Sequence, residues 1–293
     1  MNILLHGHRT KLFTYQMLVS IVELCLKHCE KVYICSEFYH EMVASESFPY
    51  HVNIVNTCKE AGSDIDFLVS VGGDGSFLSS VAFSEDCDIP VIGINTGRLG
   101  FLSNADTDEL EQVLQDLKQG KYTIEHRMLA QLHTPHFSCC NYALNDIMVH
   151  RTDLSGMIAI DVWVGGVFLN SYWGDGLIIA TPTGSTAYSL SCGGPILDPE
   201  MEAFVITPIA SHTLTARPIV IDANKEIKIK VISRTNDFML SKDSDIMKVS
   251  ADNQINITKR GQGVKTVRLQ HKDFYTIISD KLMWGVDKRK LLF

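Results

Sequence analysis

Residues 66–78 read DFLVSVGGDGSFL, and this stretch decides the fold. An apolar strand runs directly into three glycines around Asp74, and a helix-like segment follows. Glycines at a strand end let the backbone take positive φ angles and approach a ligand closely. Successive backbone N–H groups in front of a helix N-terminus can seat a phosphate. The spacing alone fits both such a seat and an ordinary Asp-Gly β-turn.

Apolar strands and helical segments alternate on both sides of this stretch. Thr10 is placed to cap a helix that ends near Cys29, and a second helix is marked over residues 106–120 by its apolar stripe and final glycine. Such β-α-β alternation predicts a parallel sheet with helices on both faces, whose ligands lie at the carboxyl ends of the strands. The other predicted strands are residues 3–7, 31–35, 51–55 and 91–95.

The pattern changes after about Tyr122. Residues 158–164 and 226–232 alternate apolar and polar side chains with a period of two, and turn residues recur between such runs. This predicts an antiparallel domain of two packed sheets. We therefore expect an α/β N-terminal domain, a parallel sheet flanked by helices, plus an all-β, sandwich-like C-terminal domain. The expected boundaries are 1–124 and 125–270, with 271–293 returning to the first domain.

Composition and charge exclude several classes of protein. The 293 residues include 26 basic and 34 acidic side chains, a net charge of −8, which disfavours non-specific binding to duplex nucleic acid. The apolar runs are far shorter than the roughly 18–20 residues of a membrane span, and no secretory signal is visible. The eight cysteines form no Cys-x-x-Cys pair and are expected to be reduced thiols, in a cytoplasmic protein.

Three further segments combine apolar strands with polar or glycine-rich residues. Residues 95–102, NTGRLGFL, put two more glycines beside a strand end, as a second wall of one crevice or as a plain loop. Residues 143–149, ALNDIMV, place an amide next to a carboxylate, a pair that can grip a ribose diol or form a bulge. Residues 174–191, GDGLIIATPTGSTAYSLS, follow a buried strand with a dense block of hydroxyl side chains, which favours a site.

Within that block, Ser185 or Thr186 can cap a following helix, and Tyr188 offers a flat face for a ring. Familiar phosphate and catalytic motifs are missing elsewhere. The sequence has no Gly-x-x-x-x-Gly-Lys-Ser/Thr loop, no Gly-x-Gly-x-x-Gly in the first βα turn and no protein-kinase signature. A P-loop enzyme and an ordinary dinucleotide-binding fold are therefore not supported.

Taken together, these four segments resemble the NAD kinase (ATP-NAD kinase) family in their order and intervals. The Gly-Gly-Asp-Gly block at 72–75 is shared with phosphofructokinases and lipid kinases, whereas the block at 175–191 is highly specific. The resemblance implies a nucleotide-binding α/β domain, a β-rich NAD-binding domain, and phosphorylation of the adenosine-ribose 2′-hydroxyl of NAD by ATP with Mg²⁺. It also implies a homodimer or homotetramer, and neither nucleic acid nor membrane as a partner.

The resemblance also implies roles for single residues. Asp74 would orient the 2′-hydroxyl and accept its proton, Asn145 and Asp146 would hold the nicotinamide-side ribose, and Asp175 would face the nicotinamide amide across a subunit boundary. Magnesium would be held mainly by the ATP phosphates. The implied NAD-binding residues are Asp74, Gly75, Asn145, Asp146, Asp175, Thr186, Ala187, Tyr188, Ser191 and Ala210, and the implied ATP-binding residues are Gly72, Gly73, Gly75 and Ser76.

Three positions depart from the family's usual pattern. Ser76 stands where threonine is commoner, Asp146 where glutamate is frequent, and Trp173 where many members carry a basic residue. The last leaves the choice between NAD and NADH open. Two other interpretations of the chain are a sugar or lipid kinase that shares the Gly-Gly-Asp-Gly block, and a non-catalytic NAD(H)-binding sensor.

Overall fold

The computed structural model describes residues 1–10, 13–43, 47–85, 87–97, 100–103, 105–134, 141–152, 156–270 and 272–284. These fall into two compact units, one of Met1–Glu125 with the described residues from Lys265 onward, and one of His126–Val264. Within these ranges no helix has both the length and the apolar character that a membrane crossing requires. Arg98 and Leu99 of the second motif, and residues 285–293 of the predicted returning tail, lie outside the described residues.

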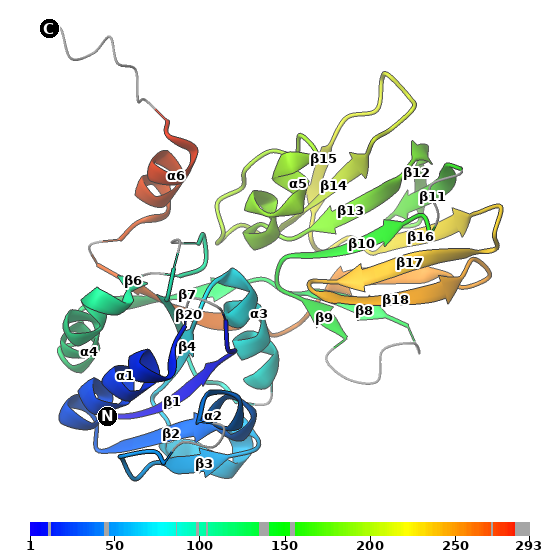
Figure 1. The fold of residues 1–293 in the computed structure, drawn as a ribbon. Helices are drawn as coiled ribbons and strands as arrows, with labels where there is room; N and C mark the ends of the chain where they lie inside the picture. The colour runs from blue at the N-terminus through cyan, green and yellow to red at the C-terminus, as the bar shows by residue number, and fades with distance from the viewer. Residues whose placement is uncertain are drawn as a thin grey trace, which may run out of the picture. The chain divides into compact units, whose positions relative to one another are not determined.

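The first unit is built on an eight-stranded sheet (Figure 1). Strand β1 (Asn2–Gly7) pairs in parallel with β2 (Lys31–Cys35) and with β4 (Phe67–Val71), and β4 pairs in parallel with β5 (Val91–Asn95). The remaining strands are β3 (Asn53–Val55), β6 (Ala105–Asp106), β7 (Tyr122–Arg127) and β20 (Val264–Leu269). The order is β3-β2-β1-β4-β5-β20-β7, with β6 on β5.

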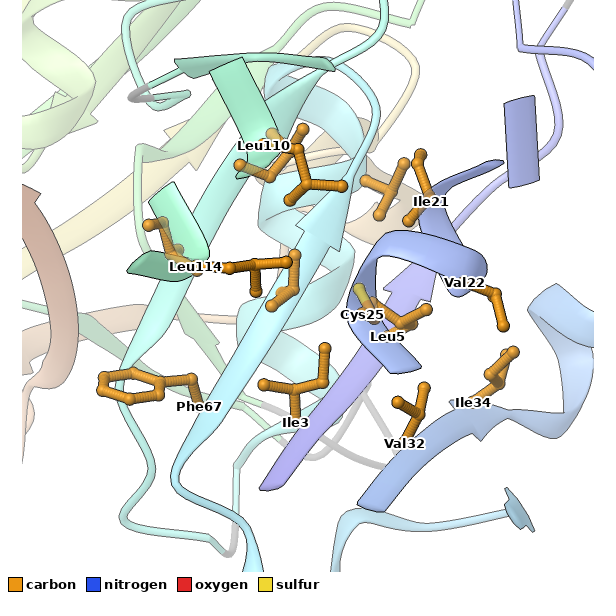
Figure 2. Close-up of a cluster of buried hydrophobic side chains, with 14 of the residues drawn as sticks. Ile3, Leu5, Ile21, Val22, Cys25, Val32, Ile34, Phe67, Leu110 and Leu114 are labelled. Atoms are coloured by element: carbon orange, nitrogen blue, oxygen red, sulfur yellow. The ribbon is translucent and has the colours of Figure 1, made fainter. Parts of the chain in front are cut away.

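Helices cover both faces of this sheet. Helices α1 (Tyr15–His28) and α4 (Leu110–Lys118) lie side by side, and Figure 2 shows their apolar side chains meeting those of Ile3 and Leu5 from β1. Helix α3 (Asp74–Phe83) packs on the opposite face, where it receives His6, because successive side chains of a strand alternate between faces. The other helices are α2 (Ser36–Val43), α6 (Phe274–Leu282) and the 3₁₀ turns Cys58–Asp64 and Thr107–Glu109.

The predicted start of the first helix was wrong by about four residues. Helix α1 begins at Tyr15, and the Thr14 hydroxyl caps it by accepting the Met17 N–H at 3.3 Å. The Thr10 hydroxyl instead accepts the Phe13 N–H at 3.1 Å. Phe13 is 2% exposed and its ring stacks 5.8 Å from that of Phe38. The chain therefore buries this ring before the helix begins.

The second unit consists of two antiparallel six-stranded sheets packed face to face. In spatial order the first sheet holds β15 (Ile219–Asp222), β14 (Ala203–Ile209), β13 (Gly176–Ala180), β10 (Asp146–His150), β17 (Asp237–Lys242) and β18 (Asp245–Ser250). The second holds β12 (Val167–Gly174), β11 (Ile158–Val164), β16 (Ile227–Ile232), β19 (Ile255–Lys259), β8 (Ala130–His133) and β9 (Tyr142–Ala143).

Alternate side chains of both sheets form one apolar core, with Ile147 and Ile179 from the first sheet and Ile160 and Ile229 from the second all fully buried. The predicted combination of an α/β domain with an all-β sandwich is therefore confirmed.

Candidate functional site

The glycine-rich turn follows β4 directly. Gly72 has φ 141°, and a Cβ on it would lie 2.2 Å from Ser76 Oγ, so only glycine fits. Its N–H donates to the Ile94 carbonyl at 2.9 Å, which ties the turn to β5. Within the described residues, no atom lies within 4 Å of a Cβ placed on Gly73 or Gly75. No side chain caps α3 at Gly73 by a hydrogen bond.

Asp74 is the first residue of α3, where a negative charge is stabilised by the helix dipole. Its Oδ2 accepts the Phe101 N–H at 3.0 Å and its Oδ1 accepts the Leu102 N–H at 3.1 Å. A Cβ on Gly100 would lie 1.8 Å from Asp74 Oδ1. The structure thus brings the first two motifs together, and the second motif holds the Asp74 carboxylate in one orientation.

In the second unit, the chain bends at Leu144 and Asn145 and enters β10 at Asp146. The Asp243 carboxylate accepts three backbone N–H groups of this bend: that of Leu144 at 2.8 Å, that of Asn145 at 2.8 Å and that of Asp146 at 3.1 Å. Burial and, to a smaller extent, the nearby charge of Asp243 together raise the pKa of the Asp146 carboxyl to about 7. Sequence reasoning missed Asp243, because nothing local marks a hairpin residue as the partner of a loop almost a hundred residues away.

The hydroxyl-rich block is clamped onto the same bend. The Thr181 hydroxyl donates to the Leu144 carbonyl at 2.5 Å, and the Thr181 N–H donates to the Asn145 carbonyl at 2.9 Å. A Cβ on Gly184 would lie 2.0 Å from the Asn145 carbonyl oxygen, so glycine is required there as well. The block and the Asn145–Asp146 bend therefore form one rigid feature.

Burial separates the hydroxyl side chains of the block into two groups. The buried group, which serves the fold, is Thr181, Thr183, Ser185 and Ser189. The four residues predicted to line a groove, Thr186, Ala187, Tyr188 and Ser191, are at least partly open to solvent, as is Leu190.

The predicted cap of the following helix was wrong. Helix α5 (Tyr188–Ser191) has Ala187 at its N-cap and no side-chain cap. The Ser185 hydroxyl donates to the Pro182 carbonyl at 2.6 Å and accepts the Leu197 N–H at 3.0 Å, and the Thr186 hydroxyl donates to the Thr183 carbonyl at 3.2 Å. Both hydroxyls bond back into the preceding turn, a local alternative to capping.

Tyr188 lies near Cys192 and Asp175, and Cys192 lies near Asp146. Partial burial raises the pKa of the Tyr188 phenol, and Cys192 and then the charge of Asp175 raise it further. Burial also raises the pKa of the Cys192 thiol, and the charge of Asp146 acts in the same direction.

Asp175 is the single residue between β12 of one sheet and β13 of the other. A Cβ on Gly174 would lie 2.7 Å from the Ile209 carbonyl oxygen, and one on Gly176 would lie 2.4 Å from that of Val149, so this corner requires glycine on both sides. The Asp175 carboxylate binds Arg151 through both oxygens, with Arg151 Nε 2.8 Å from Oδ1 and Nη2 3.2 Å from Oδ2. Sequence reasoning missed Arg151.

Ala210 lies next to this corner, directly after Ile209, whose carbonyl accepts the Asp175 N–H at 3.0 Å. Its backbone has φ 45°, which is uncommon for a residue other than glycine.

The structure gathers the predicted site residues into two groups, one around Asp74 in the first unit and one around Asn145, Asp146 and Asp175 in the second.

The chain is similar to known proteins over most of its length. The ATP-NAD kinase N-terminal domain model matches residues 5–122, and the ATP-NAD kinase C-terminal domain model matches residues 144–269. An NAD kinase of Flavobacterium psychrophilum is 41% identical over 263 residues, covering 88% of this chain and 90% of its own. An NAD kinase of Christiangramia forsetii is 38% identical over 280 residues, covering 94% and 95%.

Two solved structures are similar to this chain in fold. The crystal structure of a yeast NADH kinase complexed with NADH has a TM-score of 0.84 and 25% identity, covering 98% of this chain and 88% of that one. The crystal structure of an NAD kinase from Archaeoglobus fulgidus in complex with ATP has a TM-score of 0.74 and 24% identity, covering 97% and 99%, which supports the fold.

Proposed function

Because this chain belongs to the ATP-NAD kinase family and is an NAD kinase, we propose that it transfers the terminal phosphoryl group of ATP to the adenosine-ribose 2′-hydroxyl of NAD, giving NADP. The observation that carries this proposal is the Asp74 carboxylate, fixed by two backbone N–H groups at a helix N-terminus that no side chain caps. Family membership disfavours the sugar-kinase, lipid-kinase and sensor interpretations.

Asp74 would act mainly by orienting the acceptor hydroxyl. Each of its oxygens already accepts one N–H and keeps a second lone pair for a hydroxyl donor. A carboxylate is a weak base for an alcohol, so the proton would move late, as the phosphorus–oxygen bond forms. Phosphoryl transfer has a loose transition state, and positioning with charge stabilisation supplies most of the acceleration.

The glycine-rich turn would receive the ATP phosphates. The N–H groups at Gly73, Gly75 and Ser76 begin α3, where the helix dipole favours anions, and the Cβ positions of Gly73 and Gly75 are open among the described residues. Gly72 would contribute the turn itself. The negative charge of Asp74 at this place requires a cation if phosphates are to lie nearby.

The residues around Asp74 fit a magnesium ion that arrives bound to ATP. Among the described residues, no group of three or more His, Cys, Asp or Glu side chains could hold a metal. Magnesium is commonly bound by one or two carboxylates together with substrate phosphates, so Asp74 with the ATP oxygens would suffice. When bound, the ion would neutralise charge on the transferred phosphate.

The second unit would hold NAD. Asn145 and Asp146 would bind the nicotinamide-side ribose, Asp175 would face the nicotinamide amide, and Ala210 would contact the adenosine half. The open edge of the hydroxyl-rich block would line the groove, which is supported by the exposure of its residues: Thr186, Ala187, Tyr188 and Ser191.

We further propose that the protein is cytoplasmic and forms a homodimer or homotetramer. Light scattering of the purified protein tests the number of subunits.

One assay tests the activity. Purified protein is mixed with ATP, MgCl₂ and NAD, and NADP is measured by an NADP-specific dehydrogenase. Parallel reactions replace NAD with NADH or with sugar phosphates, and one omits the metal. Formation of NADP that depends on ATP and Mg²⁺ is expected. Binding of NAD without any ATP turnover would instead favour the sensor, and phosphorylation of a sugar alone would contradict the proposal.

A further inference from the structure

We propose that Asp243 is a positioning residue of the NAD site: from the turn between β17 and β18 it holds the Leu144–Asp146 bend in the shape that presents Asn145 and Asp146 to the dinucleotide. This inference rests on the proposed function of that bend. Asp243 itself is 97 to 99 residues further along the chain than the three amides that it binds.

Geometry carries the inference. Asp243 Oδ2 accepts the Leu144 N–H, and Oδ1 accepts the N–H groups of both Asn145 and Asp146. The Asp243 N–H returns a bond to the Asp146 carbonyl at 2.9 Å. Four bonds thus join one turn residue to three consecutive residues, an arrangement in which successive amides surround an anion. Only a short acceptor with two oxygens can satisfy all three amides at once.

The backbone of Asp243 supports this view. Its φ is 47°, a left-handed conformation in which aspartate is tolerated but glycine is preferred. The hairpin therefore keeps a carboxylate where glycine would form the turn more easily, which is expected if the carboxylate has a task. Because hydrogen bonds to charged acceptors contribute more than neutral ones, losing this one side chain should loosen the three amides, although Thr181 still binds the Leu144 and Asn145 carbonyls.

The charge of Asp243 also acts on Asp146. The groups that face Asp146 are Asp243 on the turn and Cys192 after α5, while Lys242 lies beside Asp243. Burial and Asp243 both raise the pKa of Asp146, to about 7. An ionised Asp146 accepts hydrogen bonds from ribose hydroxyls, so NAD affinity should fall as the pH drops through about 7. Without the charge of Asp243, that midpoint should move to lower pH.

The test replaces Asp243 by glycine, which removes the carboxylate while relieving the backbone. The matched control is Asn236→Gly, because Asn236 lies at the other end of β17 and also has a positive φ, 57°. For D243G we expect the KM and the calorimetric Kd for NAD to rise about tenfold or more, with KM for ATP changing less than about twofold, and the midpoint of the NAD-affinity pH profile to fall. N236G should change none of these.

A double-mutant cycle separates positioning from general damage. If Asp243 acts through Asn145 and Asp146, adding D243G to the variant that carries both Asn145→Ala and Asp146→Ala should weaken NAD binding by less than about twofold further. The inference is overturned if D243G binds NAD within about twofold of the wild type, if its loss multiplies with that of the Asn145→Ala, Asp146→Ala variant, or if NAD and ATP affinities fall together. NAD binding by calorimetry needs no turnover, so these results stand apart from the assay of the proposed activity.

Discussion

Gly100 and Asp74 fit together only because Gly100 has no side chain. A Cβ on Gly100 would lie 1.8 Å from Asp74 Oδ1, far inside van der Waals contact, and the carboxylate is meanwhile held by the N–H groups of Phe101 and Leu102. The loop and the carboxylate therefore define each other's positions. A change in either one should displace the other.

Replacing Gly100 by alanine should consequently impair catalysis more than folding. The added methyl group must push Asp74 or the loop away, so we expect kcat to fall by about tenfold to a hundredfold, since misplacement by about 1 Å costs that much. The melting temperature should drop by only a few degrees. Gly261→Ala is the control, because a Cβ there meets no described atom within 4 Å and its φ is ordinary. Wild-type kcat for G100A would show that the contact has no catalytic consequence.

Asp74→Asn should lose on the order of 10²–10⁴ in kcat in a folded protein. The amide would keep the shape of the side chain, but its NH₂ group would face one of the two backbone N–H donors and the negative charge would be gone. Asp66→Asn is the matched control: Asp66 precedes β4 at its other end, and its Oδ2 accepts the Asn2 N–H at 2.6 Å. Steady-state kinetics and circular dichroism check both. Near-normal turnover of D74N would remove Asp74 from the mechanism.

The fold class, and the glycine-rich turn between β4 and α3, could be predicted from the sequence, because a buried parallel strand that ends in glycines is a local pattern. The starts of α1 and α5 could not be predicted, whereas Asp106 does cap the segment that leads into α4. Thr10 and Thr14 are equally good caps by residue type, and burial of Phe13 decided between them. Ser185 also looked like a cap, but its hydroxyl serves Pro182 and Leu197 instead.

The residues that hold the site in place could not be predicted from the sequence, for a different reason. Asp243 and Arg151 act on residues brought near them by strand pairing: Arg151 follows β10, whose antiparallel partner β13 begins directly after Asp175. Register between strands distant in the chain is set by the packing of the whole sandwich. No local spacing in the sequence encodes such pairs.

His6 should make folding stability fall as the pH drops below about 6.5. Its ring is 5% exposed, and burial, with a smaller contribution from His8, lowers its pKa to about 3. The Ser80 hydroxyl donates its proton to the Ser76 carbonyl, so it must accept from His6 Nδ1, 2.8 Å away. Between pH 6.5 and 3 the unfolded chain binds a proton that the folded chain does not. Stability is thus lost as the pH falls through this window, by up to about 1.4 kcal/mol per pH unit.

His6→Asn keeps an N–H donor but cannot titrate. Urea unfolding at pH 7.5 and 5.5 should show a smaller loss of stability in H6N than in the wild type, by about 1 kcal/mol over this interval. His133→Asn is the control, since His133 is exposed and pairs with Thr258 on the surface. An identical pH dependence for H6N and the wild type would mean that His6 becomes protonated within the folded protein.

Arg151→Gln should raise the enzyme's activity with NAD relative to its activity with NADH. In the structure the guanidinium of Arg151 neutralises the Asp175 carboxylate through two contacts, at 2.8 and 3.2 Å. The nicotinamide ring of NAD is positively charged and that of NADH is neutral. An uncompensated Asp175 near the ring would therefore attract NAD selectively, by about 1 kcal/mol for two unit charges in a partly solvated site. The ratio of kcat/KM for NAD to that for NADH should rise about threefold to tenfold, and the effect should shrink in high salt.

Lys248→Gln, which breaks the exposed ion pair with Asp237 in the same unit, should leave the ratio unchanged. A ratio in R151Q equal to that of the wild type would show that Asp175 does not face the charged ring.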